Sequence, residues 1–391
     1  MSLALPRLSR ARIPHLRLLR PFSSTPTRYS PSPVPSIPYT ESCPAPTCAC
    51  APTPADLDID RTTPLLNTMA PYAEQVLLCT GKEDWASNLE DEGGATAEFV
   101  KGMKGVIGRG GEAFDPFTNI LLTASSLPAS EQKDSTTAYL FPSFLRIPNI
   151  PHSHAAYRAL ASAYLSAETL HPTHAALSAS QKEKITRDTA QARLLPRAER
   201  VTQPVILICG HGGRDRRCGV LGPLLQDQFR AELARRGVRA QVALVSHIGG
   251  HKYAGNVVVY LPPGWRADES KTSELKMSQS NTSESNTNES TTNESTTSNP
   301  PTPKPRLSAL QGSGIWYGRV SPSEVEGVIE ETLIRGRVVG ELLRGGVVQG
   351  GGDIGRMVEA QRKERERGGE EEGRLRLRPR ARVGTGIGAR A

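Results

Sequence analysis

The chain has 391 residues, enough for two ordinary domains with tails, and its apolar content of 37% is low. Its net charge of +8 is concentrated at the ends: residues 1–40 carry six arginines and no acidic residue, and residues 361–391 carry ten basic and five acidic residues. The rest has a small negative net charge, so we expect no nucleic-acid partner. No apolar run approaches the roughly 20 residues that cross a bilayer, so we expect no membrane insertion.

Residues 1–30 are rich in Arg, Leu and Ser and lack acidic residues. This composition is typical of a mitochondrial presequence, which predicts a mitochondrial protein, in the matrix rather than the intermembrane space. A disordered basic tail is the alternative.

Residues 31–71 are predicted to be a Pro-rich linker. It contains Cys43, Cys48 and Cys50, and three thiols within eight residues are unusual in a linker. They could form a redox switch, bind a metal transiently, or be surface cysteines without a role. The six cysteines of the chain do not resemble the disulfide framework of a small secreted protein.

Residues 72–200 are predicted to form a smaller α/β domain. Apolar runs predict strands over 74–79, 119–123 and 138–141, and alternating Ala, Leu and charged residues predict helix over 155–200. Asp84 has the residue type of a helix N-cap, so we expect a helix to begin there. Cys79, at a strand end, is expected to be a packed core thiol.

Residues 201–350 are predicted to form a second α/β domain. Its expected elements are a strand at 205–208, a Gly-rich turn, a helix over 220–236, strands at 239–245, 256–261 and 314–320, and a helix capped by Ser321 and Glu324. Residues 266–306 are rich in Ser, Thr, Asn and Glu, which predicts a disordered insertion. Residues 351–391 are expected to be a disordered charged tail.

Four candidate metal ligands follow two of these strands. Cys209 and Cys218 follow the first apolar run, and His247 and His251 follow the run at 242–245. Adjacent strands would bring two thiolates and two imidazoles to one edge of a sheet. We therefore predict a four-ligand Cys2His2 site.

This ligand set suits zinc or a two-iron cluster. Zinc fingers place their cysteines two to four residues apart, whereas eight residues separate Cys209 from Cys218, and two histidines can replace two cysteines on one iron of a [2Fe-2S] cluster. Such a cluster would be formally neutral when oxidised and would gain a negative charge on reduction. Four cations flank the ligands and are expected to stabilise the reduced state: Arg214, Arg216, Arg217 and Lys252.

The first loop also resembles two other kinds of cysteine site. A cysteine phosphatase loop needs five residues between Cys and Arg, but four separate Cys209 from Arg214, and the Cys-x-x-Cys of a dithiol oxidoreductase is absent. A core thiol with two unrelated loop histidines remains an alternative, as does a structural zinc site.

The Cys209-x8-Cys218 spacing, the Ser246-His-Ile-Gly-Gly-His-Lys-Tyr-Ala-Gly-Asn256 stretch, Gly314-Ile-Trp-Tyr-Gly-Arg319 and Arg344-Gly-Gly resemble the sucrase/ferredoxin-like family. The early cysteines, Val76–Trp85 and the presequence resemble its mitochondrial branch. The resemblance implies a thioredoxin-like ferredoxin fold for residues 201–350. It also implies a [2Fe-2S] cluster held by Cys209, Cys218, His247 and His251, and Trp316 stands where the family keeps a tryptophan.

From residues and resemblance together we expect a mitochondrial electron-transfer or redox-sensing protein, concerned with the redox quality control of protein thiols. Its partner would be a protein electron donor or acceptor, and we expect a carrier or sensor more than a stand-alone enzyme. The alternatives are a thiol oxidoreductase using Cys43, Cys48 and Cys50, or a structural zinc protein. No carboxylate pair supports sugar hydrolysis.

Overall fold

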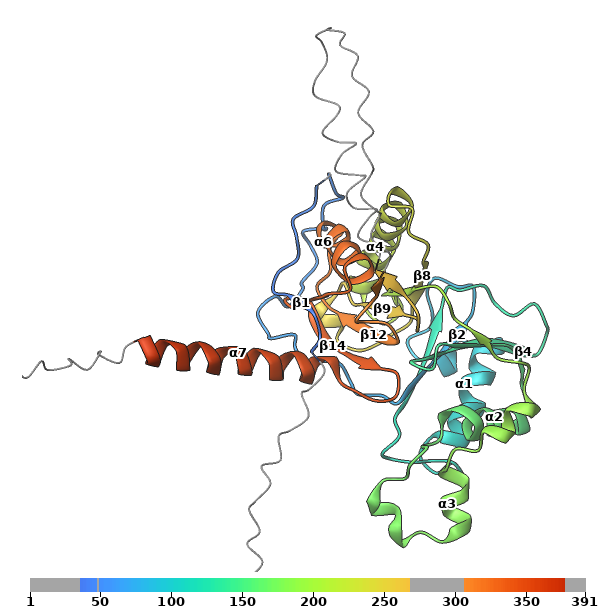
Figure 1. Ribbon diagram of the computed structural model, residues 1–391. Coiled ribbons are helices and arrows are strands. Elements are labelled where there is room, and N and C mark those ends of the chain that lie inside the picture. Colours follow the sequence, from blue (N-terminus) through green and yellow to red (C-terminus); the bar gives the residue numbers. More distant parts are fainter. Residues whose placement is uncertain (1–35, 48, 268–305, 377–391) are drawn as a thin grey trace, which may run out of the picture. The chain divides into compact units, whose positions relative to one another are not determined.

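The computed structural model describes residues 36–47, 49–267 and 306–376 (Figure 1), which all belong to one compact unit. The predicted presequence, Cys48, residues 268–305 of the predicted insertion and residues 377–391 lie outside the described residues. None of the described helices combines the length and apolar composition needed to cross a bilayer.

Within the described residues, the fold is built on a mixed sheet of ten strands. Their spatial order is β14 (Leu343–Val348), β12 (Ser313–Tyr317), β9 (Val257–Leu261), β7 (Val205–Cys209), β8 (Gln241–Val245), β3 (Ile120–Ser125), β2 (Glu74–Cys79), β4 (Ser135–Phe141), β5 (Leu145–Pro151) and β6 (Glu199–Arg200). The pairs β2–β3 and β7–β8 are parallel, and the other neighbours are antiparallel. The predicted mixed α/β fold class is confirmed.

The sheet joins the two residue ranges that the sequence assigns to separate domains. The junction is narrow, because β3 and β8 pair at a single position, Ser125 with Val245. Side chains reinforce it: the Ser246 hydroxyl accepts the Ala124 N–H at 2.9 Å, and the Ser126 hydroxyl accepts the Leu244 N–H at 2.9 Å. Both ranges therefore contribute strands to one sheet, and their division into two domains stays a prediction.

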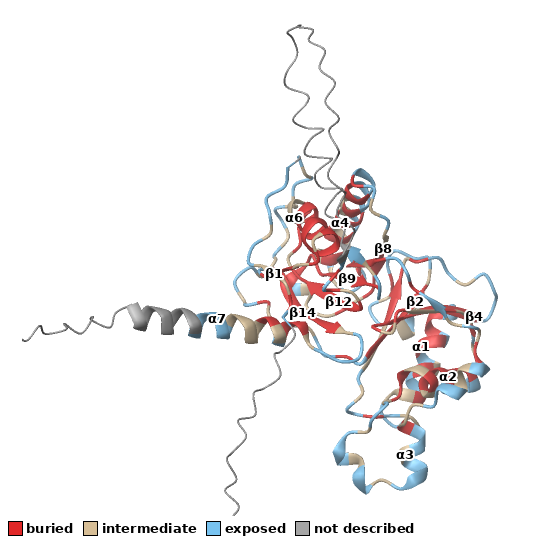
Figure 2. Ribbon diagram, in the orientation of Figure 1, coloured by how far each residue is buried: buried red, intermediate tan, exposed pale blue. Residues whose placement is uncertain are grey.

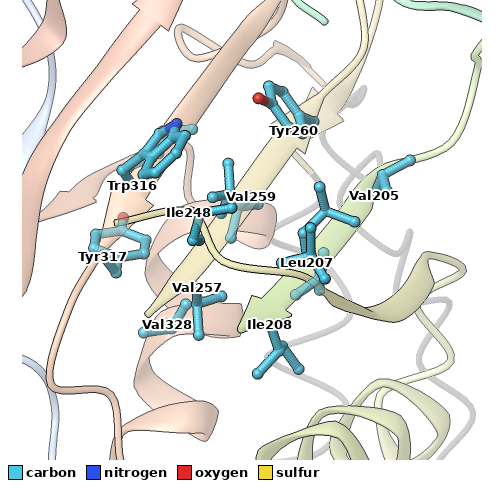
Figure 3. Close-up of a cluster of buried hydrophobic side chains, with 14 of the residues drawn as sticks. Val205, Leu207, Ile208, Ile248, Val257, Val259, Tyr260, Trp316, Tyr317 and Val328 are labelled. Atoms are coloured by element: carbon cyan, nitrogen blue, oxygen red, sulfur yellow. The ribbon is translucent and has the colours of Figure 1, made fainter. Parts of the chain in front are cut away.

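Strand β2 of the first range is buried on both faces, and its side chains alternate between two cores. On β2, Val76 and Leu78 face one core with α1 (Gly94–Ile107) and α2 (His154–Leu160). Leu77 and Cys79 face the opposite way into a larger core, so the expectation of a packed Cys79 thiol is confirmed. Figure 2 shows β2 as buried. Figure 3 shows part of that core, with side chains of β7, β9 and β12 packed together.

The helical segment expected over 155–200 is broken into short pieces. These are α2, the π-turn at Ala161–Leu165, the 3-10 turns at Pro172–Ala176 and Thr189–Leu194, and α3 (Ala179–Ile185). The helix expected at Asp84 was wrong, because the next turn is a 3-10 turn at Leu89–Asp91 and α1 starts at Gly94. The Asp84 carboxylate instead accepts the Gly213 N–H at 3.0 Å, in the loop after β7.

Two helices of the second range, α4 (Arg216–Arg235) and α6 (Pro322–Val328), lie side by side (Figure 1). The expected cap of α6 is confirmed, because the Glu324 carboxylate accepts the Ser321 N–H at 2.7 Å. The helix continues through a π-turn at Ile329–Ile334, with Arg335 at its C-terminal cap. Helix α4 begins four residues before the predicted Val220, because Asp215 caps it by accepting the Arg217 N–H at 3.0 Å.

Helix α4 packs against the loop after β7 through glycines. A Cβ atom built on Gly222 would stand 2.6 Å from Cα of Gly210, and one built on Gly219 would stand 2.5 Å from Cα of Gly212. Only glycine, which has no Cβ atom, lets the helix and the loop approach this closely. The early start of α4 and this contact together place Cys218, in the first turn of α4, over the end of β7.

The predicted linker at 31–71 was wrong over its described part. Ile37 and Leu65 are buried, and β1 (Tyr39–Thr40) pairs in parallel with β13 (Val338–Val339). A Pro-rich composition suppresses helix but leaves isolated apolar side chains free to pack, which a composition argument misses. We call residues 36–71 the N-terminal strap.

The predicted tail and insertion also need correction. Residues Ile354–Arg376 form helix α7, in which Ile354 and Val358, one turn apart, are fully buried, so a disordered tail from 351 was wrong over this stretch. The insertion is narrower than predicted, because β10 (Arg266–Ala267) pairs with β11 (Arg306–Leu307). These two strands directly precede and follow residues 268–305 in the sequence.

We predict that Gly222→Ala destabilises the protein by about 1–3 kcal/mol, because the added methyl overpacks the contact with the β7 loop. The matched control is Gly105→Ala in α1, where a built Cβ meets nothing within 4 Å, so that variant should gain about 0.5–1 kcal/mol. Urea unfolding measures both. Equal stability of the two variants would show that the glycine contact is not a constraint.

We predict a pH dependence of stability from Glu74, which is buried and accepts the Ser143 hydroxyl at 2.9 Å. Burial raises its pKa from 4.5 to about 7, so between these values the folded protein holds the proton more tightly than the unfolded chain. The free energy of unfolding should therefore fall on the order of 3 kcal/mol as pH rises from 4.5 to above 7. The free energy of unfolding of Glu74→Gln, measured by urea titration, should not show this fall between pH 5 and pH 8. A variant whose stability falls with pH as steeply as that of the wild type would contradict the role of Glu74.

Candidate metal centre

The candidate ligands follow two neighbouring parallel strands, as the sequence predicted. Cys209 is the last residue of β7 and is paired in register with Val245, the last residue of β8. His247 stands two residues beyond that pair. Both loops therefore leave the sheet at the same edge.

The two thiols form a buried pair. Cys209 and Cys218 are 2% and 1% exposed, neither is in a disulfide, and the two side chains are hydrogen-bonded to each other. The hydrogen bond from Cys218 lowers the pKa of Cys209, helped by the backbone N–H groups of His211 and Ile248 and opposed by burial. The same contact, with burial, raises the pKa of Cys218 far above its ordinary value. Cys209 is thus the thiol prepared to be anionic.

The two imidazoles form a second pair, with ring centroids 5.3 Å apart. Gly249 and Gly250 between them have φ of +81° and +73°, so the loop needs glycine at both positions. Burial lowers the pKa of His247 to about 4, and the neighbouring His251 adds to this, so His247 is neutral at physiological pH. Nδ1 of His251 is buried and, among the described residues, has no hydrogen-bond partner.

The Cys loop and the His loop touch through the backbone. The N–H of Ile248, the residue after His247, is directed at the sulfur of Cys209. Within the described residues, however, no three His, Cys, Asp or Glu side chains form a group that could hold a metal ion. The structure brings together two thiols, and separately two imidazoles, at one edge of the sheet.

His211 is a functional position that the sequence analysis missed. Its side chain is 1% exposed, its Nδ1 accepts the His247 N–H at 2.9 Å, and its Nε2 donates to the carbonyls of Trp85 and Ala86 at 3.1 and 3.0 Å. These contacts fix the neutral tautomer with the proton on Nε2 and use both ring nitrogens. His211 therefore positions the His loop and has no nitrogen left for a metal. Its place two residues after Cys209 was the available signal.

Arg344 on β14 belongs to the Arg344-Gly-Gly motif and is a buried cation whose charge helps to lower the pKa of Cys209. Its guanidinium donates to Gly249 O at 3.0 Å and to Asn256 Oδ1 at 2.7 Å, and it is 1% exposed. It also donates to the hydroxyl and carbonyl of Thr68 in the N-terminal strap, at 3.1 and 3.0 Å. Arg344 thus ties β14, the His loop and the strap together.

The cations that the sequence placed around the site have other partners. Arg216 pairs with Asp56 at 2.6 Å, and Lys252 pairs with Asp60 at 3.2 Å, both in the N-terminal strap. Arg217 holds Asp215 at 2.8 Å and donates to the carbonyl of Asp58 at 2.9 Å. Arg214 contacts the Ser87 hydroxyl at 3.3 Å. These charges fasten the strap and the 84–87 loop around the site.

Trp316 lies in the core. It is 1% exposed, its Nε1 donates to the Tyr72 hydroxyl at 3.1 Å, and the Arg344 guanidinium lies 6.0 Å from its ring centroid. The Trp316 ring therefore lies next to the Arg344 guanidinium.

Of the strap cysteines, Cys43 is partly buried against Gly327, and burial followed by nearby carboxylates raises its pKa to about 12. Such a thiol is a poor nucleophile at neutral pH. Cys50 is partly exposed, and Cys48 lies outside the described residues.

Comparison with known proteins gives one family. A profile described as Sucrase/ferredoxin-like matches residues 65–345, more than two thirds of the chain. No solved structure matches.

Three relatives are each named altered inheritance of mitochondria protein 32. The one from Debaryomyces hansenii is 37% identical over 147 residues, which cover 38% of this chain and 37% of the relative. Those from Clavispora lusitaniae and Meyerozyma guilliermondii are 32% and 31% identical, over 37% of this chain and 36% and 35% of the relatives. The matches thus span little more than a third of these relatives. The family profile, with the Cys and His pairs at one sheet edge, shows that this chain belongs to the sucrase/ferredoxin-like family.

Proposed function

We propose that this protein binds a [2Fe-2S] cluster through Cys209, Cys218, His247 and His251, and that it acts in mitochondrial electron transfer or redox sensing. The observation that carries the proposal is that a buried thiol pair and an imidazole pair lie at one edge of the sheet. The Ile248 N–H links the two loops by pointing at the Cys209 sulfur.

The residues present fit such a group in three respects. Cys209 has a lowered pKa, and thiolate is the form that binds iron. His247 is held neutral by burial, and neutral imidazole is the form that binds a metal. His251 has a buried Nδ1 without a partner among the described groups, an arrangement that is costly unless the nitrogen is used.

When bound, such a cluster would accept and release one electron. The chain's own residues would set the conditions for this. Backbone N–H groups of His211 and Ile248 donate to sulfur, which stabilises negative charge there, and burial of the two cysteines excludes water. The His251 side chain is 43% exposed, so it marks the side from which a protein electron donor or acceptor would approach.

A mitochondrial location is part of the proposal. It is supported by the composition of residues 1–30 and by the names of the relatives. The sub-compartment we expect is the matrix.

The other class of function, a thiol oxidoreductase using Cys43, Cys48 and Cys50, is less favoured. The raised pKa of Cys43 removes the reactivity that such a role would need. A structural zinc site uses the same four ligands and is separated by spectroscopy.

We predict that the full-length protein, purified without oxygen, is brown, contains iron and sulfide, and gives an electron paramagnetic resonance signal when reduced. His251→Cys should keep iron but shift the absorption and resonance spectra, because a thiolate replaces an imidazole on iron. Cys218→Ser should lose most of the iron.

The control for this experiment is His154→Ala, a histidine whose side chain is 71% exposed and which should leave both spectra unchanged. Zinc without iron, after anaerobic reconstitution with iron and sulfide, would overturn the electron-transfer proposal and leave a structural site.

We predict that His211→Ala keeps the iron content of the wild type but loses about 2–4 kcal/mol of stability. The substitution removes the hydrogen-bond partner of the His247 N–H and of the Trp85 and Ala86 carbonyls, and each lost hydrogen bond lowers the stability. Urea unfolding and iron analysis measure the two effects. Loss of iron from a variant that remains folded would instead make His211 a ligand.

A further inference from the structure

We propose that Arg344 is the internal counter-charge of the Cys209–Cys218 pair, and that it raises the reduction potential of the site by stabilising the electron-rich, more negative state. For the one-electron reduction of a bound cluster, the inference rests on the proposed function. It also applies to the two thiols alone, and this allows a separate test.

The first argument is the burial of an arginine without an acidic partner. The four acceptors around the guanidinium are neutral: two on Thr68, one on Gly249 and one on Asn256. Among the described residues, no carboxylate forms an ion pair with Arg344. A buried cation is costly unless an anion lies nearby, so this position calls for negative charge.

The second argument is which groups supply that charge. Burial lowers the pKa of Arg344 to about 10, and the groups that oppose this are Tyr253, Cys209 and Cys218. The Tyr253 ring lies 5.6 Å from the guanidinium carbon and offers its face. The backbone gives the link to the thiols: the Asn256 carbonyl accepts the Cys209 N–H at 2.9 Å, and Oδ1 of the same residue accepts from Arg344 at 2.7 Å, so one residue joins the guanidinium to the end of β7.

The third argument is the contrast with the surface cations. Arg216 and Lys252 have side chains 68% and 50% exposed and are paired with Asp56 and Asp60. Solvent and these carboxylates screen their charges, whereas the Arg344 charge acts through the protein interior. The charge of Arg344 is therefore less screened than those of Arg216 and Lys252, while Arg217, which is paired with Asp215, lowers the pKa of Cys218.

The position of the Arg344 guanidinium also explains why residue 250 is a glycine. A Cβ built on Gly250 would stand 2.5 Å from Nη2 of Arg344, so the guanidinium occupies the space beneath the loop between the two histidines. Arg344 thus holds the His loop while it faces the thiols, and its role is that of a positioning and charge-compensating residue.

The test is the reduction potential of full-length wild type, Arg344→Met, Arg344→Gln and Arg344→Lys, with Lys252→Met as the matched control that removes an exposed cation. Potentials of the reconstituted protein are measured by spectroelectrochemistry. We expect Met and Gln to lower the reduction equilibrium constant at least tenfold, about 59 mV for one electron. Lys, which keeps the charge, and Lys252→Met should change it less than threefold.

A second readout needs no cluster. Apo protein is equilibrated in glutathione redox buffers and then denatured and alkylated, so that mass spectrometry counts the thiols. In this reaction the Cys209 thiolate and the Cys218 thiol form a disulfide and give two electrons to glutathione disulfide, which takes one proton from Cys218 and one from the buffer and becomes two glutathione molecules. Arg344→Met should favour the disulfide at least tenfold, about 30 mV for two electrons.

The outcomes separate the two proposals. A wild type without iron and sulfide would end the proposed function, while the glutathione titration would still decide the role of Arg344. If Arg344→Met does not fold, the pair Gln and Lys carries the comparison. Potentials of the Gln and Lys variants that agree within threefold, or a rise in potential on loss of the charge, would overturn the counter-charge inference.

Discussion

The closeness of helix α4 to the loop after β7 is the constraint on which the candidate site depends. Gly219 and Gly222 rest on Gly212 and Gly210 with no room for a Cβ, and this contact sets the height of the helix above the sheet. Cys218, one residue before the first of these glycines, thereby reaches Cys209 at the strand end. Any side chain at the contact would separate the two sulfurs before it affected the sheet itself.

The site is held mainly by neighbours distant in the sequence. Arg344 fastens the His loop from β14, the strap aspartates pair with Arg216 and Lys252, and Asp84 and Trp85 bind the Cys loop through Gly213 and His211. The contacts of Arg344, Asp84 and Trp85 pair polar groups that the loops would otherwise bury, whereas the ion pairs of Arg216 and Lys252 with the strap are exposed. The Gly-rich loops have little stiffness of their own, so their geometry depends on these contacts.

Local patterns in the sequence predicted much of this structure. The apolar runs before Cys209 and His247 predicted adjacent strands, and the Ser321–Glu324 cap placed a helix start correctly. The strap and α7 escaped prediction because a few buried residues, such as Ile37 and Ile354, hold them against distant elements. The role of Arg344 was not predicted because it depends on burial near the cysteines, and the spacing of residues along the chain does not show which residues are buried together.

His211 adds a side-chain contact between two parts of the molecule whose strands pair at one position of the sheet, Ser125 with Val245. Its ring joins the 84–87 loop of the first range to the His loop of the second. The first range cannot move away from the second without releasing the backbone of His247. By thermodynamic reciprocity, whatever binds at the His loop tightens the seam between the two ranges by the same free energy that the seam contributes to binding. The seam and the site are therefore energetically coupled.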